Sequence, residues 1–199
     1  MRKEDGSSQR HDKCQDPLSW LAIVCLALGI LTPGASYAED TRLLAVGLRY
    51  GFTAGSPIGE KQSEHFQQHD VMAIVGLPWE WYGQSGWGIR TRLQVSAGAL
   101  RAAGETGFIG TLAPGVSVGT KNGRFSLEAA AGAALLSQYK FGSQDLGGPF
   151  QFVWNLGFKG AVYQNLGLAY YFQHISDSTI YGSDSRGYDL HLVEVSFGF

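Results

Sequence analysis

The sequence predicts an all-β fold, an eight-stranded antiparallel transmembrane β-barrel of the up-and-down type, preceded by a cleaved signal peptide. Eight segments alternate apolar and polar residues with a period of two, which is the pattern of half-buried strands. Aromatic residues make up 13% of the chain and charged residues only 16%, so the apolar sides of these strands are unusually rich in large rings. Eight is also the smallest even number of strands typical of closed outer-membrane barrels.

The first 38 residues are expected to be a signal peptide that is removed on export. An apolar run at 20–31 is followed by the small-residue exit Ser36-Tyr37-Ala38. The run is too short to cross a bilayer as a helix, which takes about 20 apolar residues. Residues 1–38 are therefore assigned to the leader and 39–199 to a single barrel domain.

Cysteine and charge narrow the class of protein further. Cys14 and Cys25 both fall in the leader, so the domain at 39–199 has no thiol and no disulfide. The net charge of −2 does not favour nucleic-acid binding, which would require a basic surplus.

In chain order, the expected strands are 41–53, 69–82, 87–100, 106–120, 124–138, 150–162, 166–176 and 187–199. The sixth alternates most clearly, with one face formed by Phe150, Phe152, Trp154, Leu156 and Phe158 and the other by Gln151, Asn155 and Lys159. The last sets Val193, Val195, Phe197 and Phe199 against Leu190, Leu192, Glu194 and Ser196. In a soluble sandwich the apolar faces would form the core, whereas in a membrane barrel they face lipid.

The polar faces favour the membrane barrel. They carry charges of both signs, namely Arg49, Glu80, Arg90, Arg92, Glu128, Lys159 and Glu194. Such charges can pair across a narrow interior, which avoids burying lone ions. Glu194 is expected to pair there with Arg90 or Lys159.

The connections alternate in length, as a membrane barrel requires. Three connections are short turns, at 83–86, 121–123 and 163–165. Three others are long loops, at 54–68, 139–149 and 177–186. The link at 101–105 should be a long loop by its place in this alternation, but it is short. With the amino terminus in the periplasm, the long loops are external. A terminal Phe199 on an apolar strand also fits recognition by the outer-membrane assembly machinery.

His174, Ser176 and Asp189 form the candidate catalytic site. Alternation places His174 and Ser176 on the lipid-facing side of one strand, about 6 to 7 Å apart at the backbone. The next strand returns antiparallel, so Asp189 is expected opposite or diagonal to them. A serine hydroxyl attacks an ester only when a base takes its proton, and a carboxylate that holds the imidazole improves that base. The three residues therefore predict a hydrolase that acts on a membrane lipid.

From residue 144 to 199 the sequence resembles the lipid A 3-O-deacylases of the PagL type. The matching features are Leu146-Gly147, Phe150-Gln-Phe152, the His174-x-Ser176 pair and Gly187-Tyr188-Asp189. The resemblance implies an eight-stranded outer-membrane barrel that removes the 3-O acyl chain of lipid A in the outer leaflet, without metal or other cofactor. It also implies that Ser176 is the nucleophile, His174 the base and Asp189 the acidic member.

The resemblance is incomplete in the oxyanion region. Family members usually follow the serine with asparagine and have a glycine two residues further on, where this chain has Asp177 and Thr179. A carboxylate repels the negatively charged oxygen, or oxyanion, that develops on the ester carbonyl during attack. Losing one hydrogen-bond donor to that oxyanion costs about 100- to 1000-fold in rate. Backbone amides of Asp177 and Ser178, or the Thr179 hydroxyl, are the expected substitutes.

Two alternatives remain at this stage. One is a non-catalytic small outer-membrane barrel that acts as scaffold, adhesin or stability protein, with His174 and Ser176 as interfacial polar residues. The other is a relative that keeps the barrel but has lost turnover.

His191, on the same face as Asp189, is interpreted as an interfacial residue, and Arg186 as a contact for lipid A phosphate. The oligomeric state is open, with a homodimer as one alternative.

Overall fold

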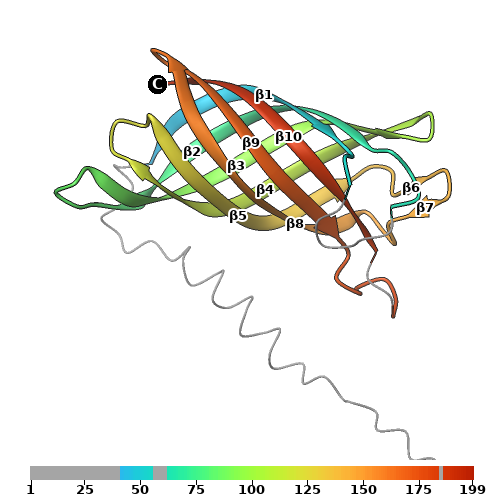
Figure 1. Ribbon diagram of the computed structural model, residues 1–199. Coiled ribbons are helices and arrows are strands. Elements are labelled where there is room, and N and C mark those ends of the chain that lie inside the picture. Colours follow the sequence, from blue (N-terminus) through green and yellow to red (C-terminus); the bar gives the residue numbers. More distant parts are fainter. Residues whose placement is uncertain (1–40, 56–61, 184–185) are drawn as a thin grey trace, which may run out of the picture. The chain divides into compact units, whose positions relative to one another are not determined.

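The computed structural model describes residues 41–55, 62–183 and 186–199, and the signal peptide expected at 1–38 lies outside them. Eight long strands form one closed antiparallel barrel (Figure 1). They are β1 (Arg42–Phe52), β2 (Gln67–Tyr82), β3 (Trp87–Ala102), β4 (Glu105–Thr120), β5 (Phe125–Leu136), β8 (Phe150–Tyr163), β9 (Leu166–Ser176) and β10 (Gly187–Gly198). The first and last strands pair and close the barrel, which confirms the predicted fold class. No helix in the described residues is long and apolar enough to cross a membrane.

The link between β3 and β4 is even tighter than the sequence suggested. The ladder continues to the pair Ala102 and Glu105, so the turn consists of two residues. Ala103 has φ of 50° and Gly104 has φ of 80°, and positive φ at both central residues is what a type I′ hairpin turn requires.

The loop at 139–149 contains a small hairpin that the sequence pattern did not reveal. It consists of β6 (Lys140–Phe141) and β7 (Gln144–Asp145), which pair antiparallel beyond the barrel wall (Figure 1). Two-residue strands are too short for a period of two to be detected.

The predicted orientation of the two faces is confirmed. Outward side chains such as Leu48 and Leu156 are 64% and 57% exposed, whereas Glu194 is fully buried inside the barrel. Ion pairs join Arg49 to Asp70, Arg92 to Glu128, and Lys159 to Glu194. The Lys159–Glu194 pair is one of the two predicted alternatives, since Arg90 pairs instead with Glu80 at the barrel rim.

The end of the barrel that holds the long loops is filled with apolar side chains. Phe66 stacks on Tyr188 with ring centroids 4.5 Å apart and meets Phe141 edge-on. Leu100 and Leu146 belong to the same buried cluster. The same cluster includes Ile175 and Tyr188, so it reaches the strand ends where the candidate site lies.

Candidate active site

The candidate site is built on the ends of β9 and β10. In the antiparallel ladder, Asp189 lies directly opposite His174, so both side chains project from the same face. His174 Nδ1 lies 2.7 Å from Asp189 Oδ1, within hydrogen-bond distance. A carboxylate accepts hydrogen bonds, so Nδ1 donates in this contact and Nε2 is the ring nitrogen that lies outside it.

This face is the outer wall of the barrel. On the other side of β9, Trp154 lies opposite His174 and Phe152 lies opposite Ser176. The rings of Trp154 and His174 have centroids 5.7 Å apart. These are the outward positions of β8, where Phe152 is 36% exposed.

The three polar side chains are nevertheless well shielded. His174 is 8% exposed, Ser176 is 6% exposed and Asp189 is fully buried. The loop before β2 contributes to this cover, because Gln62 Nε2 donates to the Asp189 carbonyl at 3.2 Å. Because little water reaches the pair, the electrostatic attraction between the His174 ring and the Asp189 carboxylate is screened less than it would be at an exposed site.

Ser176 occupies the last position of β9, beside a glycine. Gly187 lies directly opposite it, and a Cβ at Gly187 would come within 2.9 Å of Ser176 Cβ and 2.3 Å of the Ile175 carbonyl oxygen. Glycine therefore allows the two strand ends to approach at this point. The hydrogen bond of His174 goes to Asp189. Within the described residues Ser176 Oγ makes no hydrogen bond, to His174 or to any other group.

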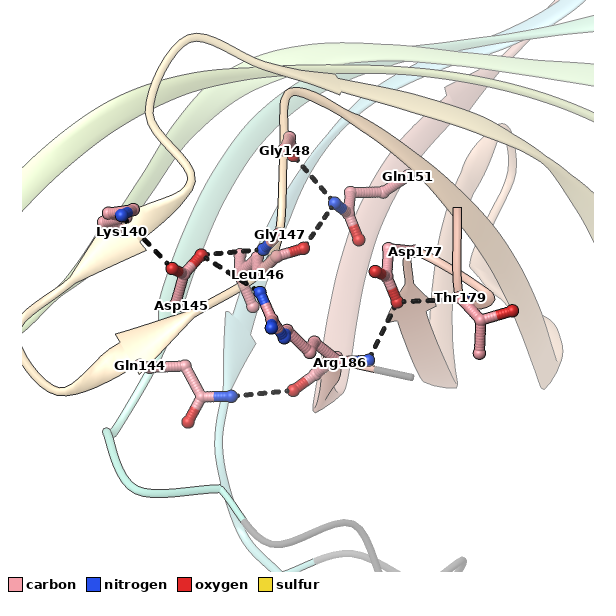
Figure 2. A network of polar contacts seen from close by, with 11 residues as sticks. Lys140, Gln144, Asp145, Leu146, Gly147, Gly148, Gln151, Asp177, Thr179 and Arg186 are labelled. Carbon is pink, nitrogen blue, oxygen red and sulfur yellow. Dashed lines mark hydrogen bonds and ion pairs between the residues drawn. The ribbon is translucent and has the colours of Figure 1, made fainter. Parts of the chain in front are cut away.

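Asp177 closes the loop that follows β9 (Figure 2). Its Oδ1 accepts the N–H of Thr179 at 3.2 Å and that of Arg186 at 2.8 Å, and its own N–H donates to the Arg186 carbonyl at 3.0 Å. Ser178 and Thr179 both have positive φ, at 48° and 67°. The Asp177 amide is therefore engaged within the loop, whereas the Ser178 amide makes no hydrogen bond to any described residue.

Two comparisons with known proteins bear on this geometry. The family model for lipid A 3-O-deacylase (PagL) matches residues 69–198, which is most of the barrel and includes the whole candidate site. The chain belongs to this family. The fold is similar to a crystal structure of the outer membrane enzyme PagL, with a TM-score of 0.63 and 15% sequence identity, covering 78% of this chain and 99% of that one. A search of curated proteins gave no match.

Polar contacts tie the three long loops of this family member together around the site. Gln144 Nε2 donates to the Gly187 carbonyl at 3.2 Å, and Gln144 Oε1 accepts from the Ser63 hydroxyl at 2.7 Å. Asp145 contacts Lys140, the Gly147 amide and, at 3.9 Å, the Arg186 guanidinium (Figure 2). Arg186 was interpreted from sequence as a phosphate contact, and its described charge partner is this carboxylate.

Backbone amides lower the pKa of two carboxylates in this network. The N–H of Gly147 lowers the pKa of Asp145 below its ordinary value. The N–H and hydroxyl of Ser143 lower the pKa of Glu64 in the same way. Both groups therefore stay charged at neutral pH and hold the loops in one arrangement.

Sequence reasoning did not identify Gln62, Gln144 or Trp154 as part of the site. Glutamine in a loop has no distinctive signal, because its role depends on which carbonyl it reaches. Trp154 was assigned to the outward face, and its position beside His174 follows only from the register of β8 against β9. His191 lies away from the pair, with Nδ1 bonded to the Tyr170 hydroxyl.

Proposed function

We propose that this chain is an outer-membrane esterase that removes the 3-O acyl chain of lipid A. The observation that carries the proposal is the 2.7 Å contact between His174 Nδ1 and Asp189 Oδ1 on the outer wall, two residues from Ser176, in a member of the lipid A 3-O-deacylase family. The outward location supports a lipid substrate, because an ester in the outer leaflet reaches this wall without leaving the membrane.

In the proposed first step, Ser176 Oγ attacks the ester carbonyl carbon while His174 Nε2 takes the hydroxyl proton. The tetrahedral intermediate collapses when the bond to the sugar 3-oxygen breaks, and that oxygen receives the proton from His174. Water then hydrolyses the acyl-enzyme with the same base, which releases the hydroxy fatty acid. Asp189 holds the imidazole in the productive tautomer and stabilises its charged form.

The oxyanion of the intermediate needs donors near Ser176. The Ser178 amide and the Thr179 hydroxyl are the proposed donors, because the Asp177 amide already donates to Arg186. Asp177 is proposed to act through loop closure, since its Oδ1 accepts two backbone N–H groups. Asparagine could make the same two contacts through its own Oδ1.

The experiment is expression of the full-length chain in a Gram-negative host, followed by mass spectrometry of lipid A. The wild-type chain is expected to give lipid A lacking one hydroxyacyl chain, and Ser176→Ala is expected to abolish this product. Ser196→Ala is the matched control, because Ser196 is a buried strand serine on the interior face, and it should retain deacylation. Deacylation that persists in a folded Ser176→Ala variant overturns the mechanism.

Two other outcomes correspond to the alternatives. A wild-type barrel that folds and leaves lipid A unchanged supports a non-catalytic barrel. If Asp177→Asn then gains deacylation, the chain is a relative that lost turnover at this position. Equal activity of Asp177→Asn and the wild type supports the loop-closing role proposed here.

A further inference from the structure

Trp154 differs from the other large side chains on the lipid-facing side of β8. Its neighbours along that face, Phe152, Leu156 and Phe158, are 36%, 57% and 49% exposed. Trp154 carries the largest side chain of this row, yet it is only partly exposed. The indole therefore packs along the barrel wall, whereas the side chains around it project towards lipid.

His174 is the site residue that this indole contacts. Trp154 lies directly opposite His174 in the ladder of β8 and β9, and Asp189 lies directly opposite it in the ladder of β9 and β10. His174 is thus the middle member of a row of three side chains that crosses three strands. The centroids of the indole and the imidazole are 5.7 Å apart, and the two planes meet at 36°, closer to parallel than to perpendicular.

The two flanking side chains restrain the imidazole in different ways. Asp189 Oδ1 holds Nδ1 of the ring at 2.7 Å. A single hydrogen bond leaves a ring free to tilt about that contact. The indole occupies the opposite side, so it limits the tilt of His174 towards β8. Phe172 packs against the indole in turn, with ring centroids 5.4 Å apart, which helps to hold Trp154 in place.

The indole also neighbours the charge that the proposed reaction creates. In that mechanism His174 takes the Ser176 proton and becomes positively charged. A cation within about 6 Å of an indole ring is attracted by the ring, and the attraction is strongest where little water reaches the pair. His174 is only 8% exposed, which meets this condition. Because the attraction grows as the proton is transferred, it favours the transition state over the bound substrate.

We propose that Trp154 is a positioning residue, which holds the His174 ring in the orientation that serves Ser176. This inference rests on the proposed function. Trp154 acts through the imidazole and not on the reacting atoms. Its loss should therefore lower kcat, because the base is less well placed during the reaction, and leave KM unchanged, because substrate binding does not depend on the orientation of the base.

The test measures kcat and KM for lipid A hydrolysis by the purified barrel in detergent micelles. Trp154→Leu is expected to lower kcat about tenfold and to leave KM within about twofold of wild type. Trp154→Phe keeps a flat ring beside His174 and should recover most of the lost kcat. Leucine suits a lipid-facing position, as Leu156 shows, so the barrel should fold. Trp154→Met is the second variant if it does not.

Phe158 offers a matched control on the same face of β8. It lies opposite Tyr170 in the same ladder, with ring centroids 5.7 Å apart and planes that meet at 33°. This contact has nearly the geometry of the Trp154 contact, but its partner is not part of the candidate site. Phe158→Leu should therefore keep kcat within about twofold of wild type, even if its midpoint of urea unfolding falls as far as that of Trp154→Leu.

A kcat within about twofold of wild type in folded Trp154→Leu overturns the positioning role, and so does an equal fall of kcat in Phe158→Leu. A change confined to KM would mean that the indole contacts the substrate, which also overturns it. The same holds if Trp154→Phe recovers nothing, since a ring beside His174 is then not what matters.

Failure of the proposed function looks different. The wild-type barrel would then leave lipid A intact, or Ser176→Ala would still deacylate it, and the positioning role would fall with the function. If the wild type is active and Ser176→Ala is inactive while Trp154→Leu keeps the wild-type kcat, only the positioning role fails.

Discussion

Strand β10 carries two fully buried carboxylates, Asp189 and Glu194, whose settings differ in one important respect. Glu194 faces the barrel interior and pairs with the Lys159 amine at 3.1 Å. Asp189 faces the outer wall and pairs with His174, whose imidazole ring has two nitrogens and can both accept and donate a proton. The five-residue separation puts the two on opposite faces, because side chains alternate along a strand.

The difference predicts two separate roles for carboxylates on one strand. A lysine partner inside the barrel pairs with the buried carboxylate and has no substrate beside it, so this pair contributes to the stability of the barrel. A histidine partner can accept a proton from a neighbouring hydroxyl, and the carboxylate stabilises the resulting charge. The interior pair is therefore expected to affect stability, and the outer pair to affect rate.

The largest expected effect comes from Asp189→Asn. An amide side chain no longer favours the tautomer with a proton on Nδ1, and in serine hydrolases this loss lowers kcat by about 10,000-fold. The measurement is the initial rate of ester hydrolysis by the purified barrel, with urea unfolding to show that stability is retained. Activity within tenfold of wild type would contradict a role for Asp189 in orienting His174.

The next effect, on stability, comes from Glu194→Gln. Removing the interior carboxylate leaves the Lys159 ammonium without its partner, and breaking a buried pair costs about 3–5 kcal/mol. The midpoint of urea unfolding should fall while the rate per folded molecule stays within a few-fold of wild type. Glu80→Gln is the control, since its exposed pair with Arg90 contributes about 0–1 kcal/mol. A large loss of kcat in Glu194→Gln would mean that the interior pair does more than stabilise the fold.

The difference between these two carboxylates could largely be predicted from sequence. A period of two assigns Asp189 and Glu194 to opposite faces without coordinates, and the apolar residues that accompany Asp189 identify its face as the outer one. The eight strands were predictable for the same reason, because each is long enough to repeat the pattern several times. Strand ends were less certain, since hairpin ladders continue into turns such as Ala103-Gly104.

Other parts of the site could not be predicted, because they depend on contacts between loops. Asp177 Oδ1 accepts hydrogen bonds from its own loop, in which Ser178 and Thr179 have positive φ, and no pattern in the sequence predicts those angles. The reach of Gln62 to the Asp189 carbonyl joins residues 127 positions apart. The direct pairing of Asp189 with His174 required the register between β9 and β10, which the sequence limited to opposite or diagonal.

A smaller effect on the outer pair is expected from Gly187→Ala. The new Cβ would meet the Ile175 carbonyl oxygen at 2.3 Å, so the strand ends must separate and Ser176 must shift. Overpacking of this kind costs about 1–3 kcal/mol, and displacing Ser176, the proposed nucleophile, should lower kcat/KM about tenfold. Gly160→Ala is the control, because its Cβ would have only the Arg124 carbonyl oxygen nearby, at 3.8 Å. Equal rates for the two variants would show that the spacing of β9 and β10 does not govern the position of Ser176.

The smallest effect concerns the loops that cover the outer pair, and it depends on pH. Glu64 accepts the N–H and hydroxyl of Ser143, which lower the pKa of this carboxyl below its ordinary value of 4.5. Because the folded pKa is the lower one, the contact is complete above pH 4.5 and is lost as the pH falls through the lowered value. The amide proton shift of Ser143 in micelles should follow this titration, and Glu64→Gln should remove the pH dependence. A midpoint at or above pH 4.5 would mean that the Ser143 contact does not favour the charged carboxylate, so that the cover over Asp189 would have to be held by Gln62 and Gln144.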